Sequence, residues 1–185
     1  MRPPADVTGL ILAGGHSRRF GRDKALADVN GVSLVALVYA AIAPHACEVL
    51  IATGATARTY PVPARVVLDA APESGPLGGL VAALAAARTP WLLVAACDLA
   101  GLTAPALAPL LAAPDASADV LVATDADGRR QPVCALCRVA TVAPRAMAHL
   151  ASGRLALHVL LDVLDVREVP LDPAALRNAN TPGDL

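Results

Sequence analysis

The chain has 185 residues and a formal net charge of −1 at pH 7, with 56% hydrophobic but only 2% aromatic residues. This length predicts one domain, residues 1–185. Because aromatic residues are few, we expect a core built mainly from Ala, Val and Leu. The nearly neutral charge and an isoelectric point near 6.4 argue against a basic surface that binds nucleic acid. Mean hydropathy is +0.55, yet no apolar run is long enough to span a bilayer. The N-terminal residues show no signal-peptide pattern. We therefore expect a cytoplasmic protein without a membrane partner.

Short apolar runs alternate along the chain with segments whose apolar residues recur at helical spacing. The apolar runs predict strands at residues 7–12, 48–53, 65–69, 91–97, 119–123, 131–138 and 165–170. The periodic segments predict helices at residues 34–43, 76–87, 103–112, 139–150 and 155–164. Ser33 precedes the first helix as a candidate cap, and Asn30-Gly31 indicates a tight turn.

The segment WLLVAAC, residues 91–97, is apolar at every position, so both faces of that strand should be covered, as in a parallel sheet between helix layers. The alternation therefore predicts an α/β fold, a three-layer α/β/α sandwich with a mostly parallel, Rossmann-like central sheet. Ligands bind beyond the carboxyl ends of the strands in such sheets. We expect the loop after Leu12, together with Asp69 and Asp98, to meet at one edge.

The loop after the first predicted strand, residues 12–24, reads LAGGHSRRFGRDK. Gly14 and Gly15 allow backbone N–H groups to approach phosphate oxygens, and Arg19 and Lys24 are among the cations that offset phosphate charge. A Walker A loop is excluded because Lys24 is followed by Ala rather than Ser or Thr, and a G-x-G-x-x-G motif is absent. The alternative is an ordinary loop with solvated charges, which this combination of residues disfavours.

The same loop resembles the L-A-G-G-x-S-x-R-M-G-x-D-K signature of nucleotidyltransferases of the molybdenum cofactor guanylyltransferase type, with Phe20 in place of the usual Met. Three later segments resemble that family's G-P-L-x-G, C-D-x-P and N-x-N-T-P motifs, in order: residues 75–79 (GPLGG), 97–99 (CDL) and 178–182 (NANTP). The resemblance spans nearly the whole chain and implies the fold of the nucleotide-diphospho-sugar transferase type.

The activity implied by this resemblance is transfer of GMP from GTP to molybdenum-bound molybdopterin, with release of pyrophosphate and formation of the guanine dinucleotide cofactor. It implies that Arg19 and Lys24 hold the β- and γ-phosphates, and that Asp98 holds Mg²⁺. The other nucleotide-side or pterin-side residues that it implies are Leu12, Ala13, Gly14, Gly15, Asp69 and Asn180. A phosphate nucleophile is already ionised, so no general base is required.

Several alternatives stay open at this point. Asp98 and Asp69 could be ordinary loop carboxylates, and Asn180 could form an Asx turn before Pro182. Residues 52–54 read ATG where guanylyltransferases often have Asn, so a molybdopterin cytidylyltransferase is an alternative. Another is a nucleotidyltransferase for a sugar or alditol phosphate, and a further one is a nucleotide-binding regulator without turnover.

Two other features receive weaker interpretations. Cys134 and Cys137 form a C-x-x-C pattern, but on a strand residues three apart point to opposite faces, so structural cysteines are favoured over a zinc site. Gln131 could face the second substrate or simply mark the start of a strand. Transient contact with molybdenum-insertion or molybdoenzyme proteins is also expected from the resemblance.

Overall fold

The computed structural model describes residues 6–14, 23–112 and 117–179. Its main sheet contains the strands β1 (Val7–Leu12), β4 (Glu48–Ala52), β5 (Arg65–Val67), β6 (Trp91–Ala96), β7 (Val120–Thr124), β8 (Arg130–Arg138) and β9 (Val166–Pro170). Each predicted strand is present within two residues of its expected bounds. The strand order across the sheet is β5-β4-β1-β6-β8-β7-β9.

The sheet is mostly parallel, as predicted. β1 pairs in parallel with both β4 and β6, β4 pairs in parallel with β5, and β7 pairs in parallel with β9. Only β8 runs the other way, antiparallel to β6 and β7. The carboxyl ends of β5, β4, β1 and β6 therefore lie side by side at one edge, and β7 ends in the same direction.

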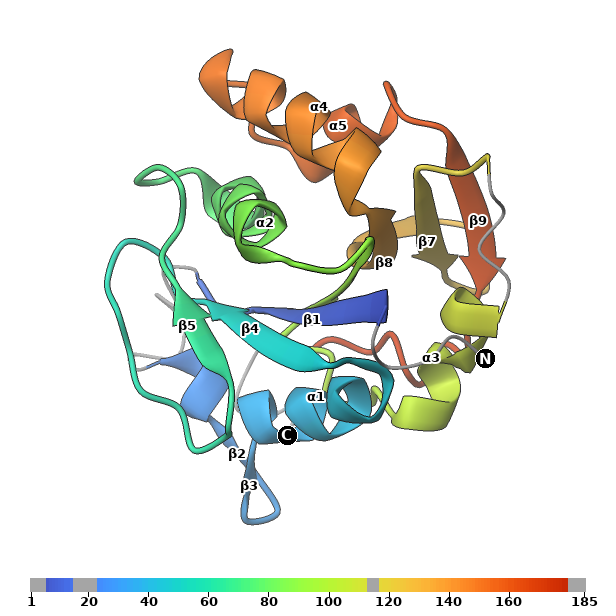
Figure 1. Cartoon of the computed structure of the whole chain (residues 1–185). Helices are drawn as coiled ribbons and strands as arrows, with labels where there is room; N and C mark the ends of the chain where they lie inside the picture. Colours follow the sequence, from blue (N-terminus) through green and yellow to red (C-terminus); the bar gives the residue numbers. More distant parts are fainter. Residues whose placement is uncertain (1–5, 15–22, 113–116, 180–185) are drawn as a thin grey trace.

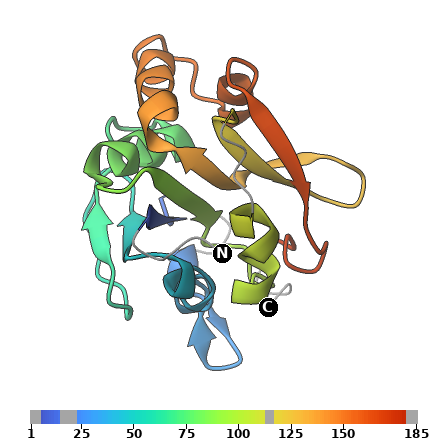
Figure 2. The same ribbon diagram turned by 45° about the vertical axis from the view of Figure 1, so that its right-hand side comes forward.

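Helices cover both faces of the sheet (Figures 1 and 2). One face packs against α1 (Leu34–Ile42) and α3 (Ala104–Ala112), and the other against α2 (Gly75–Ala86), α4 (Val139–Ala151) and α5 (Leu157–Leu161). Along β6, Leu93 joins the core beside α1, whereas Leu92 and Val94 join the core beside α2. This arrangement is the three-layer α/β/α sandwich that the sequence predicts.

Few aromatic side chains are available to fill the core, and small residues instead allow helices and strands to pack closely. A Cβ atom at Gly79 of α2 would lie 2.7 Å from the Cβ atom of Ala52 in β4, so this helix approaches the sheet at a distance that only glycine permits. Trp91 is 2% exposed, and the Arg138 guanidinium lies 4.5 Å from the centroid of its ring. Trp91 is therefore a core residue.

Three local features differ from the sequence-based expectation. The first is a short hairpin that was not predicted, formed by β2 (Asp28–Val29) and β3 (Val32–Ser33). The predicted tight turn at its tip is confirmed, since the φ values of 52° for Asn30 and 88° for Gly31 match a type I′ turn. Ser33 occupies the N-cap position of α1 with an extended backbone, but its hydroxyl makes no capping hydrogen bond and is buried without a hydrogen-bond partner among the described residues. Helix α5 is shorter than the predicted 155–164.

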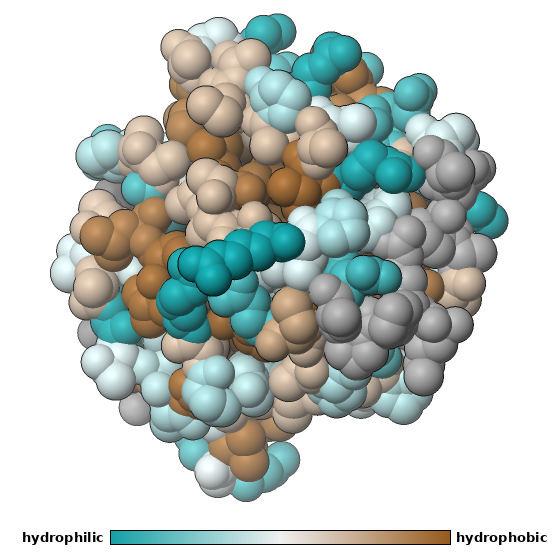
Figure 3. Space-filling view, viewed as in Figure 1, coloured by the Kyte–Doolittle hydropathy of each residue, from teal (hydrophilic) through white to brown (hydrophobic). Residues whose placement is uncertain are grey.

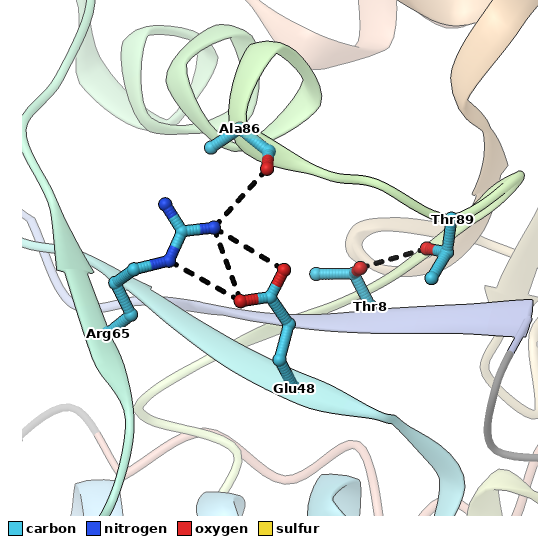
Figure 4. Close-up of polar contacts among 5 residues, drawn as sticks. All are labelled: Thr8, Glu48, Arg65, Ala86 and Thr89. Atoms are coloured by element: carbon cyan, nitrogen blue, oxygen red, sulfur yellow. Dashed lines mark hydrogen bonds and ion pairs between the residues drawn. The ribbon is translucent and has the colours of Figure 1, made fainter.

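Polar contacts hold the opposite edge of the sheet, where β4 and β5 begin (Figure 4). Arg65 donates to both carboxylate oxygens of Glu48 at 3.2–3.3 Å and to the carbonyl of Ala86, at the end of α2, at 3.2 Å. The hydroxyls of Thr8 and Thr89 lie 2.8 Å apart. Hydrophilic and hydrophobic side chains are interspersed over this view of the molecule (Figure 3).

Among the described residues, none of the helices is both long enough and apolar enough to cross a membrane.

Candidate active site

The loops after β1, β4 and β5 meet backbone to backbone at the carboxyl edge of the sheet. The Gly54 N–H donates to Asp69 Oδ1 at 3.1 Å, and the Asp69 N–H donates to the Gly54 carbonyl at 3.0 Å. A Cβ atom at Gly14 would lie 2.8 Å from the Gly54 nitrogen. Gly14 is therefore required by the close approach of two loops as well as by the backbone access that its sequence motif predicts.

Lys24 and Asp98 form an ion pair at the same edge. Lys24 begins the short 3₁₀ helix η2 (Lys24–Leu26), and its Nζ atom lies 2.9 Å from Asp98 Oδ2. Asp98 lies two residues after the end of β6, and the N–H of the preceding Cys97 donates to the Leu12 carbonyl at 3.0 Å. The two side chains are 17% and 23% exposed, so a cation and a carboxylate face each other in a part-buried position that a charged ligand can still reach.

The C-terminal motif begins beside Asp98. The Ala179 N–H donates to the Asp98 carbonyl at 2.9 Å, and Asn178 forms an isolated antiparallel bridge with Leu99. Residues that are far apart in the sequence are thus joined at the point where β6 ends. Asn180, the residue of this motif singled out in the sequence, lies outside the described residues.

Asp69 is half-buried between the end of the sheet and the start of α2. A Cβ atom at Gly79 would lie 3.3 Å from Asp69 Oδ1, and the Ala70 N–H donates to the Gly78 carbonyl at 3.1 Å. Burial raises the pKa of Asp69, while the hydrogen bond from Gly54 opposes that rise. The carboxylate is thus a hydrogen-bond acceptor held in a fixed position.

Asp23 connects this edge to the segment between β4 and β5. Asp23 Oδ1 accepts from the Ala25 N–H at 3.0 Å, while Oδ2 receives the Tyr60 hydroxyl at 3.2 Å and lies 3.0 Å from Arg58 Nη1. Sequence analysis missed Arg58 and Tyr60 because neither belongs to a recognisable motif. Their role depends on the fold of residues 53–64, which periodicity does not describe.

The family model for the MobA-like NTP transferase domain matches residues 9–165. The chain belongs to the MobA-like NTP transferase family. It is 37% identical to a probable molybdenum cofactor guanylyltransferase from Chloroflexus aggregans, covering 97% of this chain and 91% of that protein. It is 34% identical to the molybdenum cofactor guanylyltransferase from Vibrio cholerae, covering 98% and 91%.

Solved structures share the MobA-like fold. One is the molybdopterin-guanine dinucleotide biosynthesis protein A from Archaeoglobus fulgidus, with a TM-score of 0.76, 21% identity and coverage of 96% of this chain and 94% of that chain. Another is the 2-C-methyl-D-erythritol 4-phosphate cytidylyltransferase from Thermus thermophilus, with a TM-score of 0.75, 22% identity and coverage of 97% and 95%. Both show the nucleotidyltransferase fold of the predicted type.

Other residues singled out in the MobA-like sequence are placed as follows. Arg19 and Gly15 lie outside the described residues. Leu12 ends β1, and the Ala13 N–H donates to the Ala52 carbonyl at 2.8 Å, so both backbones continue the sheet into the loop. Gln131 donates to Asp125 Oδ2 at 3.3 Å.

Thr53 stands where the family resemblance leads one to expect Asn. Its side chain is 1% exposed, and its hydroxyl donates to the Thr56 carbonyl at 2.8 Å. Because a hydroxyl has one proton to donate, Thr53 uses it within its own loop. It therefore does not act as the donor that an Asn at this position could supply.

The C-x-x-C pattern is not a metal site. Cys134 packs in the core beside α1 and Cys137 in the core beside α2, on opposite faces of β8, so the prediction of structural cysteines is confirmed. Within residues 6–14, 23–112 and 117–179, no group of three or more His, Cys, Asp or Glu side chains could hold a metal ion. The Asp98 carboxylate is suited to be the single protein ligand of a cation whose other ligands are phosphate oxygens and water. Proteins commonly bind Mg²⁺ in this way.

Proposed function

We propose that this protein transfers GMP from GTP to molybdenum-bound molybdopterin, releasing pyrophosphate and forming the guanine dinucleotide cofactor. The observation that carries the proposal is the meeting of Lys24, Asp98 and the Asp69–Gly54 contact at one sheet edge in a chain of this family. The names of relatives that are 34–37% identical over nearly the whole chain support the choice of substrates.

The loop after β1 would bind the triphosphate. Leu12 and Ala13 use their backbones to continue the sheet into this loop, and the backbone N–H groups of Gly14 and Gly15 would face the phosphates. Arg19 and Lys24 hold the β- and γ-phosphates and stabilise the charge that builds up on the leaving pyrophosphate. Lys24 reaches this position by exchanging its Asp98 partner for phosphate oxygens.

Asp69 would contact the nucleotide base. Guanine offers a carboxylate two adjacent N–H donors, whereas cytosine offers one amino group. A half-buried carboxylate that is fixed by Gly54 therefore suits guanine better than cytosine. Asp69 would therefore select GTP over CTP without a contribution from Thr53.

Asp98 would hold Mg²⁺ when the nucleotide binds, and the ion would supply positive charge that screens the phosphates. The acceptor phosphate is ionised at neutral pH and attacks without a general base, so this chain's residues act by alignment and charge stabilisation. Asn180 and Gln131 are proposed to lie on the pterin side. The whole chain, residues 1–185, would act as one nucleotidyltransferase domain.

Pyrophosphate release tests this function directly. Purified protein is incubated with Mg²⁺, molybdenum-bound molybdopterin and GTP, CTP, ATP or UTP in turn. We expect release with GTP that requires the pterin. Selection of CTP would replace the guanylyl assignment with a cytidylyl one, and release with a sugar or alditol phosphate but not the pterin would replace the acceptor. Binding of nucleotide without release in any combination would favour a regulator.

A further inference from the structure

Two side chains from the connection between β4 and β5 hold the residue that precedes Lys24. Arg58 and Tyr60 converge on a single oxygen of Asp23, with Arg58 Nη1 at 3.0 Å and the Tyr60 hydroxyl at 3.2 Å from Oδ2. We call Asp23, Arg58 and Tyr60 the Asp23 clamp. It joins two loops that follow adjacent strands of the sheet.

The clamp is anchored in the core. Tyr60 is 7% exposed and belongs to the hydrophobic cluster that includes residues of α1, so its ring cannot move without disturbing that cluster. Burial, reinforced by Asp23, raises the pKa of Tyr60 to about 12. The hydroxyl therefore stays protonated and donates to Asp23 throughout the physiological pH range. The hydrogen bond to Asp23 likewise raises the pKa of Arg58.

The other oxygen of Asp23 acts on the backbone that carries Lys24. Asp23 Oδ1 accepts from the Ala25 N–H at 3.0 Å, and Asp23 is the N-cap of η2. The Asp23 carboxylate is therefore fixed by the clamp on one side and fixes the first turn of η2 on the other. Lys24 begins that turn and extends its amine to the carboxyl edge.

We propose that Arg58 and Tyr60 are positioning residues that set the location of the Lys24 amine through Asp23. This inference rests on the proposed function, in which Lys24 stabilises charge on the leaving pyrophosphate. Neither Arg58 nor Tyr60 need touch the nucleotide, because their effect passes through the Asp23 carboxylate to the η2 backbone. A small displacement of a charge-stabilising group is costly to the rate when the reacting groups must be aligned.

Steady-state pyrophosphate release by Arg58→Ala tests the proposal. We expect kcat to fall between about tenfold and about a hundredfold, with KM for GTP changing less than about threefold, because Lys24 acts mainly on charge that develops in the transition state. Tyr60→Phe removes only the hydroxyl and should lower kcat less. Arg58→Lys should recover part of the rate, since it keeps the charge without the planar fork.

A double-variant cycle separates positioning from direct contact. Asp23→Asn keeps an oxygen for the Ala25 N–H but places amide hydrogens against Arg58. If Arg58 acts through Asp23, adding Arg58→Ala to Asp23→Asn lowers kcat no further, within about twofold. Multiplicative losses would overturn the proposal, because they would mean that Arg58 contacts the nucleotide itself.

The matched control is Arg65→Ala, which breaks an arginine–carboxylate pair with Glu48 at the opposite edge of the same two strands. Backbone amide hydrogen exchange of residues 24–27 in the nucleotide-free protein should accelerate in Arg58→Ala and not in Arg65→Ala. Equal kcat and equal exchange in the two variants would overturn the proposal. A wild-type protein that releases no pyrophosphate would instead contradict the proposed function, and hydrogen exchange would still decide whether the clamp holds this turn.

Discussion

Lys24 and Asp98 neutralise each other across the carboxyl edge, at 2.9 Å and with about a fifth of each side chain exposed. An ion pair in this part-buried position contributes only modestly to stability, because the cost of removing both charges from water offsets much of their attraction. A metal-bound triphosphate offers each member of the pair a replacement, a cation for Asp98 and phosphate oxygens for Lys24. The pair is therefore suited to keep both side chains at the edge until the ligand arrives.

Asp98→Ala should separate catalysis from folding. We expect pyrophosphate release to fall by about 10²–10³, by analogy with the loss of other charge-stabilising groups. The free energy of unfolding should fall by about 1–3 kcal/mol, because the part-buried Lys24 loses this carboxylate, which corresponds to about 2–12 °C in Tm for a chain of this size. Steady-state kinetics and calorimetry on the same preparation measure the two effects.

Glu48→Ala is the control for this variant, because Glu48 also pairs with a cation but lies where β4 begins, away from the carboxyl edge. It should keep the wild-type rate. Unchanged turnover in Asp98→Ala would remove this carboxylate from the mechanism.

At the scale of elements, α2 shows how glycine sets the distance between layers. Gly79 faces Ala52 of β4 and lies beside both Leu12 and Asp69, so the same position governs packing and the placement of a site carboxylate. Side chains in a closely packed interface have little room to adjust. A methyl group at this position would therefore push the helix from the sheet or displace Asp69.

Gly79→Ala should destabilise the protein although alanine favours helices. Overpacking commonly costs about 1–3 kcal/mol, against a gain in helix propensity of about 1 kcal/mol, so we expect a net loss of up to about 2 kcal/mol. Urea denaturation measures this change, and the KM for GTP should rise as Asp69 shifts. Ala85→Gly, on the exposed face of α2, gives the propensity effect alone. A Gly79→Ala protein as stable as wild type would show that the interface can relax.

At the scale of the whole molecule, the cysteines divide by burial. Cys97, Cys134 and Cys137 are buried, whereas Cys47 is exposed. Burial raises the pKa of each of the three buried thiols from 9.0 to about 12. In alkaline solution the three buried thiols therefore keep their protons in the folded protein, whereas the same thiols lose their protons in the unfolded chain.

Stability should therefore fall in alkaline solution. Between about pH 9 and 12 the folded chain binds more protons than the unfolded chain, and the free energy of unfolding decreases as pH rises through this window. Below pH 9 these thiols should contribute no pH dependence. Urea denaturation at pH 8 and pH 10 checks the sign, and a thiol reagent at pH 8 should titrate one cysteine in the folded protein and four in urea. Rapid reaction of four thiols in the folded protein would contradict the burial.

The hydrophobic pattern of the sequence predicted most helices and strands of this molecule. It could do so because the spacing of buried residues along a helix or strand is set by residues that are close together in the sequence. WLLVAAC could be recognised as a strand covered on both faces, and it became β6. The order of the strands could not be derived, since β8 is inserted between β6 and β7 by packing between distant segments. The same apolar run is compatible with either strand direction, which is why the antiparallel direction of β8 was not foreseen.

The candidate site was predictable where a short motif carries the chemistry. Asp69 and Asp98 stand at the ends of predicted strands, and parallel pairing brings such strand ends together. Lys24 belongs to the recognisable motif in the loop after the first predicted strand. Arg58 and Tyr60 lie in an irregular connection, so their meeting with Asp23 depends on the path of a loop. Ser33 illustrates the opposite error: it does occupy the N-cap position that its place in the sequence predicts, but its hydroxyl makes no capping hydrogen bond, and sequence position alone does not determine where a side chain points.

The bridge between Leu99 and Asn178, with the bond from Ala179 to the Asp98 carbonyl, also has a practical consequence. A purification tag or fluorescent reporter joined on the C-terminal side would pull on Ala179 and, through its hydrogen bond, on the Asp98 backbone. Val7 pairs with Trp91 at the other end of the strands, so an affinity handle joined on the N-terminal side would pull on the edge away from Lys24 and Asp98.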